Sequence, residues 1–172
     1  ISSSVLLEPE VKVTPLDGGC DNIATHQLNY TGPQDPNDKV VVSPEGFGPC
    51  HAIELNDTLV YQVNFQNIGS SPASDVIIRD TLDPTLLDMS TFKLISASHT
   101  VTYFNQLASG LLEWMFVGIN LPDSSSDLTG SVGFVSFSVQ PEQTLAPGTV
   151  IENSAGIIFD FNLPVITNTV FN

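Results

Sequence analysis

Two oxygen-rich stretches interrupt an otherwise β-like sequence and suggest a cation site. The stretch DPNDK carries Asp35, Asn37 and Asp38, and the stretch DFN near the C-terminus carries Asp160 and Asn162. Residues two apart in an extended chain point to the same side, so DFN presents paired oxygens, whereas DPNDK supplies its three residues within four positions on a turn stiffened by proline. Ca²⁺ takes about six to eight oxygen ligands from carboxylates, amides, carbonyls and water. The spacing therefore predicts a calcium site built from both stretches, with Asx-turns and a bulge cap as the plainer alternative.

The two cysteines, Cys20 and Cys50, lie in surroundings rich in glycine and proline. Their wide separation differs from the close spacing of a metal-binding cysteine pair. In an extracellular protein we expect them to form a disulfide, which would close a loop of about 30 residues and contribute roughly 3.5 kcal/mol in the chain-entropy model. The alternative is a pair of unlinked thiols.

The motifs of common enzyme families are missing from the sequence. It has no Gly-x-Ser-x-Gly elbow, no His-Glu-x-x-His zinc motif and no phosphate-binding glycine loop, so we expect no enzymatic activity. The 172 residues include 4 Lys and Arg against 19 Asp and Glu, a formal net charge of −15. Nucleic acids and anionic membranes need basic surfaces, so neither is an expected partner. The acidity fits cation binding in an extracellular setting, and it equally fits a solvated surface.

The elements that position these residues are short strands separated by turns. Alternation in TLVYQVNFQ places Leu59, Tyr61, Val63 and Phe65 on one face, and SVGFVSFSVQP (131–141) alternates in the same way. Further strands are expected over residues 74–84, 91–98, 99–105, 111–122, 149–161 and 164–171, with 91–98 and 99–105 forming a pair. The pattern predicts an all-β protein, an Ig-like antiparallel β-sandwich with Greek-key connections and about seven to nine strands. No apolar run is as long as the roughly 20 residues of a membrane-spanning helix, so membrane insertion is not expected.

Residues 1–34 differ from the rest and are predicted to be an N-terminal extension to a sandwich domain over 35–172. The extension contains a strand-like segment with apolar residues at Val5, Leu7, Val11 and Val13, and Pro9 excludes a continuous central strand. Such a strand can add to the sheet edge of a neighbouring copy and build a filament. The alternatives are that it packs on its own domain or joins it to a preceding tandem module.

Four stretches, taken in order, resemble an Ig-like conserved repeat domain of large bacterial surface and secreted proteins. They are DPNDKVVVSPEG, LVYQVNFQNIGSSPASDVIIRDTLDPTLLDMSTFKLISASH, the pair LPDSSSD and GFVSFSVQP, and IENSAGIIFDFNLPVITNT. The resemblance covers about residues 35–172. It implies an extracellular, cell-surface β-sandwich with a structural or adhesive role and no catalytic residues. It also implies that the DPNDK and DFN stretches are features of the family.

Two functions follow from these observations. The first is a structural module of a bacterial surface fibre, filament or adhesin stalk, stabilised by calcium and joined to neighbouring copies or tandem modules through its terminal strands. The second is a β-sandwich module that binds glycan or protein on its loops. Only aromatic residues support the second function, and alternation assigns most of them to strands: Trp114, Tyr30, Tyr61 and Tyr103.

Overall fold

Strands form where apolar and polar residues alternate. The structure, a computed structural model, describes residues 36–172. Every second residue of the strand over 59–66 is buried, and these are the four residues predicted to share a face. The strands are β1 (Lys39–Ser43), β2 (Leu59–Gln66), β3 (Val76–Thr81), β4 (Leu87–Ala97), β5 (Tyr103–Gln106), β6 (Leu111–Phe116), β7 (Val132–Pro141), β8 (Glu152–Asn153), β9 (Ala155–Phe159), β10 (Val165–Ile166) and β11 (Val170–Phe171).

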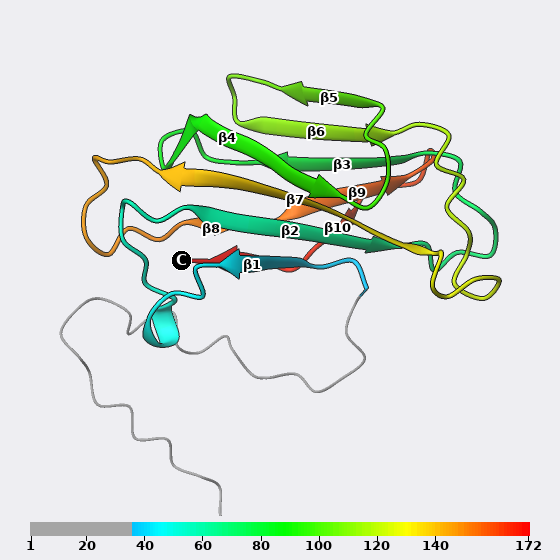
Figure 1. Cartoon of the computed structure of the whole chain (residues 1–172), viewed down its shortest axis with the longest axis horizontal. Coiled ribbons are helices and arrows are strands. Elements are labelled where there is room, and N and C mark those ends of the chain that lie inside the picture. The colour runs from blue at the N-terminus through cyan, green and yellow to red at the C-terminus, as the bar shows by residue number, and fades with distance from the viewer. Residues whose placement is uncertain (1–35) are drawn as a thin grey trace, which may run out of the picture.

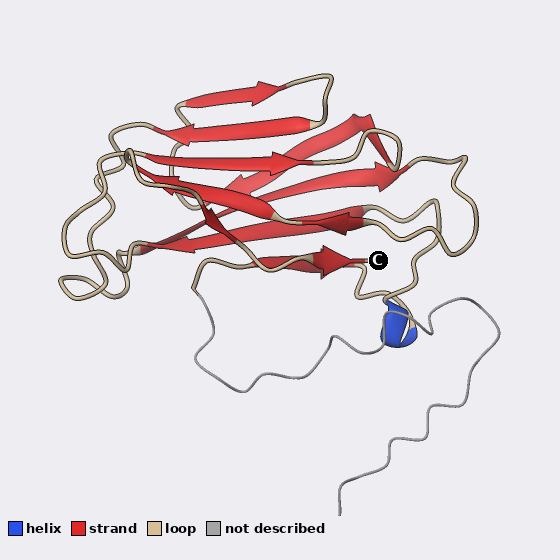
Figure 2. Cartoon of the chain, turned by 180° about the vertical axis from the view of Figure 1, so that it is seen from behind, coloured by secondary structure: helices blue, strands red, loops and turns tan. Residues whose placement is uncertain are grey.

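The strands are arranged in two facing layers, with loops gathered at both ends (Figures 1 and 2). One sheet has the order β1-β2-β7-β4, and the other has the order β10-β9-β3-β6-β5. A two-stranded ribbon pairs β11 with β8, and all pairs are antiparallel. β1 pairs with β2, β5 with β6 and β9 with β10, but the other neighbours within each sheet are distant in sequence, so the chain crosses repeatedly between layers. The predicted antiparallel sandwich is therefore confirmed.

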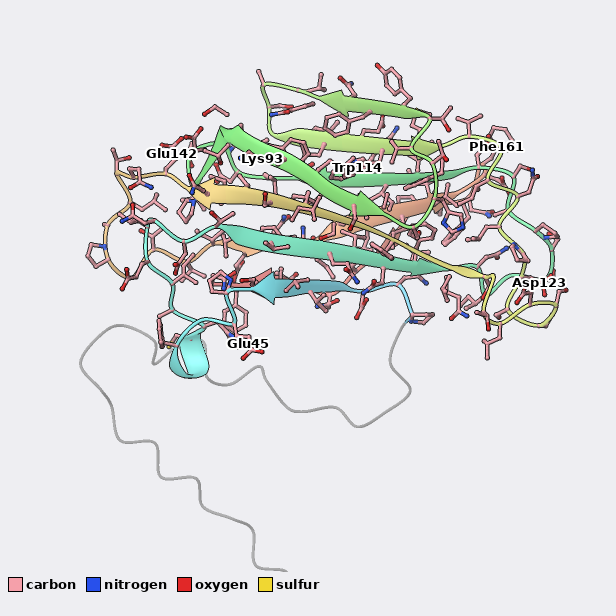
Figure 3. The ribbon with its side chains drawn as sticks, viewed as in Figure 1. Glu45, Lys93, Trp114, Asp123, Glu142 and Phe161 are labelled. Carbon is pink, nitrogen blue, oxygen red and sulfur yellow. The ribbon has the colours of Figure 1, made fainter. Side chains whose placement is uncertain are left out.

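The core lies between the inner faces of the two sheets. Trp114 of β6 is fully buried and stacks on Phe137 of β7, with ring centroids 5.2 Å apart. Its neighbour Glu113 faces outward and pairs with Arg79 of β3, as alternation predicts. Figure 3 shows Trp114 within the sandwich, away from the loops at its ends. Aromatic contacts thus join the two layers.

The segments at 91–98 and 99–105 are strands, but they do not pair with each other. β4 joins β7 in one sheet, whereas β5 joins β6 in the other. Phe92 of β4 and Phe104 of β5 instead stack between the two sheets near the surface, with ring centroids 5.3 Å apart. Asp83 lies in a short turn before β4. Its carboxylate accepts a hydrogen bond from the backbone N–H of Thr85, and β4 begins at Leu87.

The first and last described strands lie beside each other. β1 contacts β11, and Figure 1 shows the C-terminus next to β1. The only helix in the described part is a short 3₁₀ turn over Gly48–Cys50. Within residues 36–172 no helix has the length and apolar character needed to cross a bilayer.

Candidate functional site

The DPNDK stretch begins β1 and binds the neighbouring strand. Asp35 lies outside the described residues. Asn37 is buried, and its side-chain oxygen accepts a hydrogen bond from the backbone N–H of Gln66 at 3.1 Å. The Asp38 carboxylate accepts one from the Asn64 side chain at 2.7 Å. These oxygens therefore help fix the start of β1 to β2.

The DFN stretch ends β9 and ties it to the chain before β3. The backbone N–H of Asp160 donates to the Asp75 carbonyl at 2.9 Å, and its carboxylate accepts from the Asp75 N–H at 2.9 Å. Asp160 has a φ of 54°, in the left-handed region, which Asp tolerates better than most residues. The side chain of Asn162 is exposed, and the backbone N–H of Asn162 donates to the Phe159 carbonyl at 3.1 Å. The carboxylate that interrupts the apolar run thus closes the strand end.

These two stretches belong to different sheets, since β1 and β9 do. Among residues 36–172, no three acidic, histidine or cysteine side chains gather as a metal site would require. The calcium site stays a prediction, and one of its expected ligands, Asp35, lies outside the described residues. The Cys20–Cys50 disulfide also stays a prediction, because Cys20 lies outside the described residues.

A different cluster of polar side chains lies inside the core. Three residues occupy inward positions that alternation reserves for apolar side chains. Lys39 pairs directly with Val63 and shares its inward face. Asp80 follows the buried residues Val76 and Ile78 at spacing two in β3. Asn153 continues the inward series of Ile151, Ala155 and Ile157.

One carboxylate holds both of the other polar groups. The Lys39 Nζ donates to Oδ2 of Asp80 in a short ion pair. The Asn153 Nδ2 donates to Oδ1 of the same carboxylate at 2.9 Å. Lys39 and Asp80 are 0% exposed and Asn153 is 5% exposed. An amine, a carboxyl group and a carboxamide therefore meet in a site closed to solvent.

Aromatic rings surround the Lys39 amine. Its Nζ lies 4.6 Å from the ring centroid of Tyr61 and 5.2 Å from that of Phe137. Burial lowers the pKa of Lys39, and the charge and hydrogen bond of Asp80 partly oppose this effect. Burial, followed by the charge of Asp80, raises the pKa of the Tyr61 hydroxyl, which keeps it protonated. Burial thus favours the uncharged forms of Lys39 and Tyr61, and Asp80 is the group that favours the charged form of Lys39.

Asn168 fixes the backbone of Lys39 from the C-terminal segment. Its side-chain oxygen accepts from the Lys39 N–H and its side-chain N–H donates to the Lys39 carbonyl, both at 2.9 Å. The side-chain oxygen of Thr167, the residue before Asn168, accepts a hydrogen bond from the backbone N–H of Ala155 at 3.0 Å. The segment after Asn153 therefore helps position the amine as well as the amide.

Sequence reasoning missed this cluster, although the alternation contained a signal for it. Asp80 and Asn153 each continue a period-two series of apolar residues, where an unpaired polar residue would be costly. Three inward polar residues with complementary chemistry suggest that they pair with one another. Which partner belongs to which residue follows only from the packing of the two sheets.

The aromatic residues considered for ligand stacking are mostly unavailable. Trp114 and Tyr61 are buried in the core, while Tyr103 is 54% exposed. Tyr30 lies outside the described residues. A sugar cannot stack on rings enclosed in the core, so these residues give the binding-module alternative little support.

The fold and the buried cluster define an Ig-like β-sandwich in which β1, β3 and β8 are joined through the core. The chain belongs to a family described as a domain of unknown function, DUF7619, which matches residues 35–172. No curated protein matches it. The particular repeat family expected from the motifs stays a prediction.

Solved structures with a similar fold include pilin and adhesin domains. Domains D2 and D3 of the major pilin SpaD from Corynebacterium diphtheriae match with 18% identity and a TM-score of 0.53, over 78% of this chain and 51% of that one. The N-terminal domain of the Streptococcus gordonii adhesin Sgo0707 matches with 13% identity and a TM-score of 0.52, over 80% of this chain and 32% of that one. The chain thus spans about half or less of these structures, and the likeness concerns the fold.

Proposed function

We propose that this chain is an extracellular structural module of a bacterial surface fibre, filament or adhesin stalk. The observation that supports this function most directly is the buried cluster of Lys39, Asp80 and Asn153. It connects the first strand, the opposite sheet and the C-terminal segment at one point. A module that transmits tension between its two ends needs such a connection, because otherwise its terminal strands peel away first. Similarity to pilin and adhesin folds supports the same role.

Terminal strands join neighbouring modules in this proposal. The apolar segment over residues 1–15 adds to the sheet edge of the next copy, where backbone hydrogen bonds supply affinity. The test compares the full chain with a variant lacking residues 1–15 by electron microscopy and size-exclusion chromatography. Fibres from the full chain and monomers from the truncated chain are expected. A full chain that stays monomeric at high concentration contradicts assembly through this strand.

Calcium stabilisation is a separate part of the proposal. The net charge of −15 supports it, as do the oxygen-bearing side chains of the two stretches: Asp35, Asn37, Asp38, Asp160 and Asn162. A bound cation offsets repulsion between carboxylates, so its removal lowers stability. The full chain is expected to melt at a lower temperature in EDTA than in millimolar calcium. Equal melting temperatures in EDTA and in calcium would contradict the calcium site. Magnesium at the same concentration is the control for a non-specific effect of divalent cations.

A further inference from the structure

The Lys39 amine is an unusual group to enclose in a β-sandwich core. A buried lysine without reaction partners would need only a counter-ion, and Asp80 supplies one. The same carboxylate also holds the side-chain amide of Asn153 on its second oxygen. Asp80, which can transfer protons, therefore holds an amine and a carboxamide next to each other in a site closed to water. These two groups are the reactants of an amide exchange.

We propose that Lys39 and Asn153 join covalently, forming an intramolecular amide cross-link with Asp80 as the catalytic residue. The cross-link connects the first residue of β1 to the last residue of β8. It does not depend on the role in a surface fibre, since a folded domain of any function can form it.

The atoms balance without an external reactant. Asp80 takes a proton from the Lys39 ammonium, and the neutral Nζ attacks Cγ of Asn153. The Nζ–Cγ bond forms and the Cγ–Nδ2 bond breaks, with Asp80 returning the proton to Nδ2. Nδ2 leaves with its own two hydrogens and takes up the protons released by the amine, so it departs as ammonium. One amide replaces another, and no oxidant, reductant or cofactor is needed.

Three features of the site favour this reaction. Desolvation lowers the pKa of Lys39, so the nucleophilic, uncharged amine forms more readily than in water. The leaving nitrogen already contacts Asp80, which places the general acid at the bond that breaks. Asn168 holds the Lys39 backbone, so the fold supplies the orientation that a reaction between free side chains lacks.

The cross-link changes how the domain bears tension. Force applied to the chain on both sides of the link passes through the new amide bond and bypasses residues 40–152. These residues contain β2 to β7 and therefore most of both sheets. Unfolding under tension is then confined to the short segments outside the link.

The test is the intact mass of the reduced full chain. A cross-linked chain is lighter than its sequence mass by one ammonia molecule. Trypsin gives a second readout that needs no variant: cleavage after Lys39 is blocked because its amine is acylated. A branched product should join the fragment over residues 13–79 to the fragment over residues 94–172, and tandem mass spectrometry should place the branch at Lys39 and Asn153.

Variants separate the chemistry from the fold. Asn153→Ala, Lys39→Met and Asp80→Ala should each have their full sequence mass. Lys93→Met is the matched control because Lys93 lies on β4, outside the cluster, and this variant should keep the ammonia loss. Circular dichroism shows which variants fold, and the digest of the unaltered chain decides the question if a variant does not.

Three results would overturn the proposal. The first is a reduced chain at its full sequence mass. The second is the loss of water in place of ammonia, which would make Asp80 the acceptor. The third is an ammonia loss without a branched peptide, which would indicate cyclisation of an asparagine elsewhere in the chain.

Discussion

Asp80 and Asp123 are both shielded carboxylates, but they find their partners in opposite ways. Asp80 lies in β3 and meets Lys39 and Asn153, which are 41 and 73 residues away in the sequence. Asp123 lies in the loop between β6 and β7, at one end of the sandwich (Figure 3). Its donors are Ser125 and Ser126, two and three residues further along.

The two environments also differ in what satisfies the negative charge. Asp80 faces an ammonium group in an aromatic core. Asp123 accepts from the hydroxyl groups of both serines and from their backbone N–H groups at 3.2 and 3.0 Å. A local turn supplies these donors by itself, whereas the partners of Asp80 meet only when both sheets have assembled. Asp80 therefore depends on the whole fold, and Asp123 depends on one loop.

The largest expected effect is that of Asp80→Ala. The change leaves Lys39 without its counter-ion in the core, which costs about 3–5 kcal/mol, and it also prevents the cross-link. Urea denaturation measures the loss in the free energy of unfolding. The matched control is Glu113→Ala, which breaks the ion pair with the half-exposed Arg79 and should cost at most about 1 kcal/mol. Equal losses in the two variants would show that the buried carboxylate of Asp80 contributes no more to stability than a surface ion pair does.

Asn153→Ala should have a smaller but still large effect. It removes the cross-link and keeps the Lys39–Asp80 ion pair. Without the link, the unfolded chain regains the freedom of the loop over residues 40–152, which corresponds to about 4–5 kcal/mol in the chain-entropy model. Urea denaturation of the variant and of the unaltered chain measures the difference. A loss below about 1 kcal/mol would mean that the unaltered chain carries no such constraint.

The contrast between the two carboxylates also explains what the sequence could predict. The sandwich follows from alternation, because burial in β2 and β6 repeats every second residue. The LPDSSSD stretch predicts a turn, since Asp followed by serines is a local capping pattern. Local signals of this kind need no knowledge of which strands are neighbours.

The partners of Asp80 could not be predicted in the same way. Alternation marks Asp80 and Asn153 as inward polar residues, but it does not say that β1, β3 and β8 meet. The predicted pairing of the segments at 91–98 and 99–105 is wrong for the same reason, because β4 and β5 are neighbours in sequence but belong to different sheets. The spacing of the DPNDK and DFN oxygens predicts a cation site, whereas those of Asn37, Asp38 and Asp160 accept hydrogen bonds from β2 and from the residue before β3.

Asp123→Ala is expected to destabilise the fold less than Asn153→Ala, with an effect that depends on pH. Hydrogen bonds from Ser125 and Ser126 lower the pKa of Asp123 below its ordinary value of 3.8. A carboxylate with a lowered pKa stabilises the fold above its ordinary pKa and loses that contribution as the pH falls through the lowered one. Thermal melting of the unaltered chain and of Asp123→Ala, at pH 7 and at decreasing pH, measures the difference in stability between them. A difference that stays constant down to low pH contradicts the charge-dependent capping.

Ser125→Ala should have the smallest effect. It removes one hydroxyl donor to Oδ1 of Asp123 and leaves the backbone N–H of Ser125 and both donors of Ser126 in place. The side chain of Ser125 is exposed, so water can replace the lost hydroxyl, and the expected loss is within about 1 kcal/mol. Ser124→Ala is the matched control in the same loop, because the donors to Asp123 come from the two residues after Ser124. Urea denaturation of both variants measures the difference. A loss as large as that of Asp123→Ala would mean that one hydroxyl determines the loop, and that Asp123 depends on a single partner rather than on a shared set of donors.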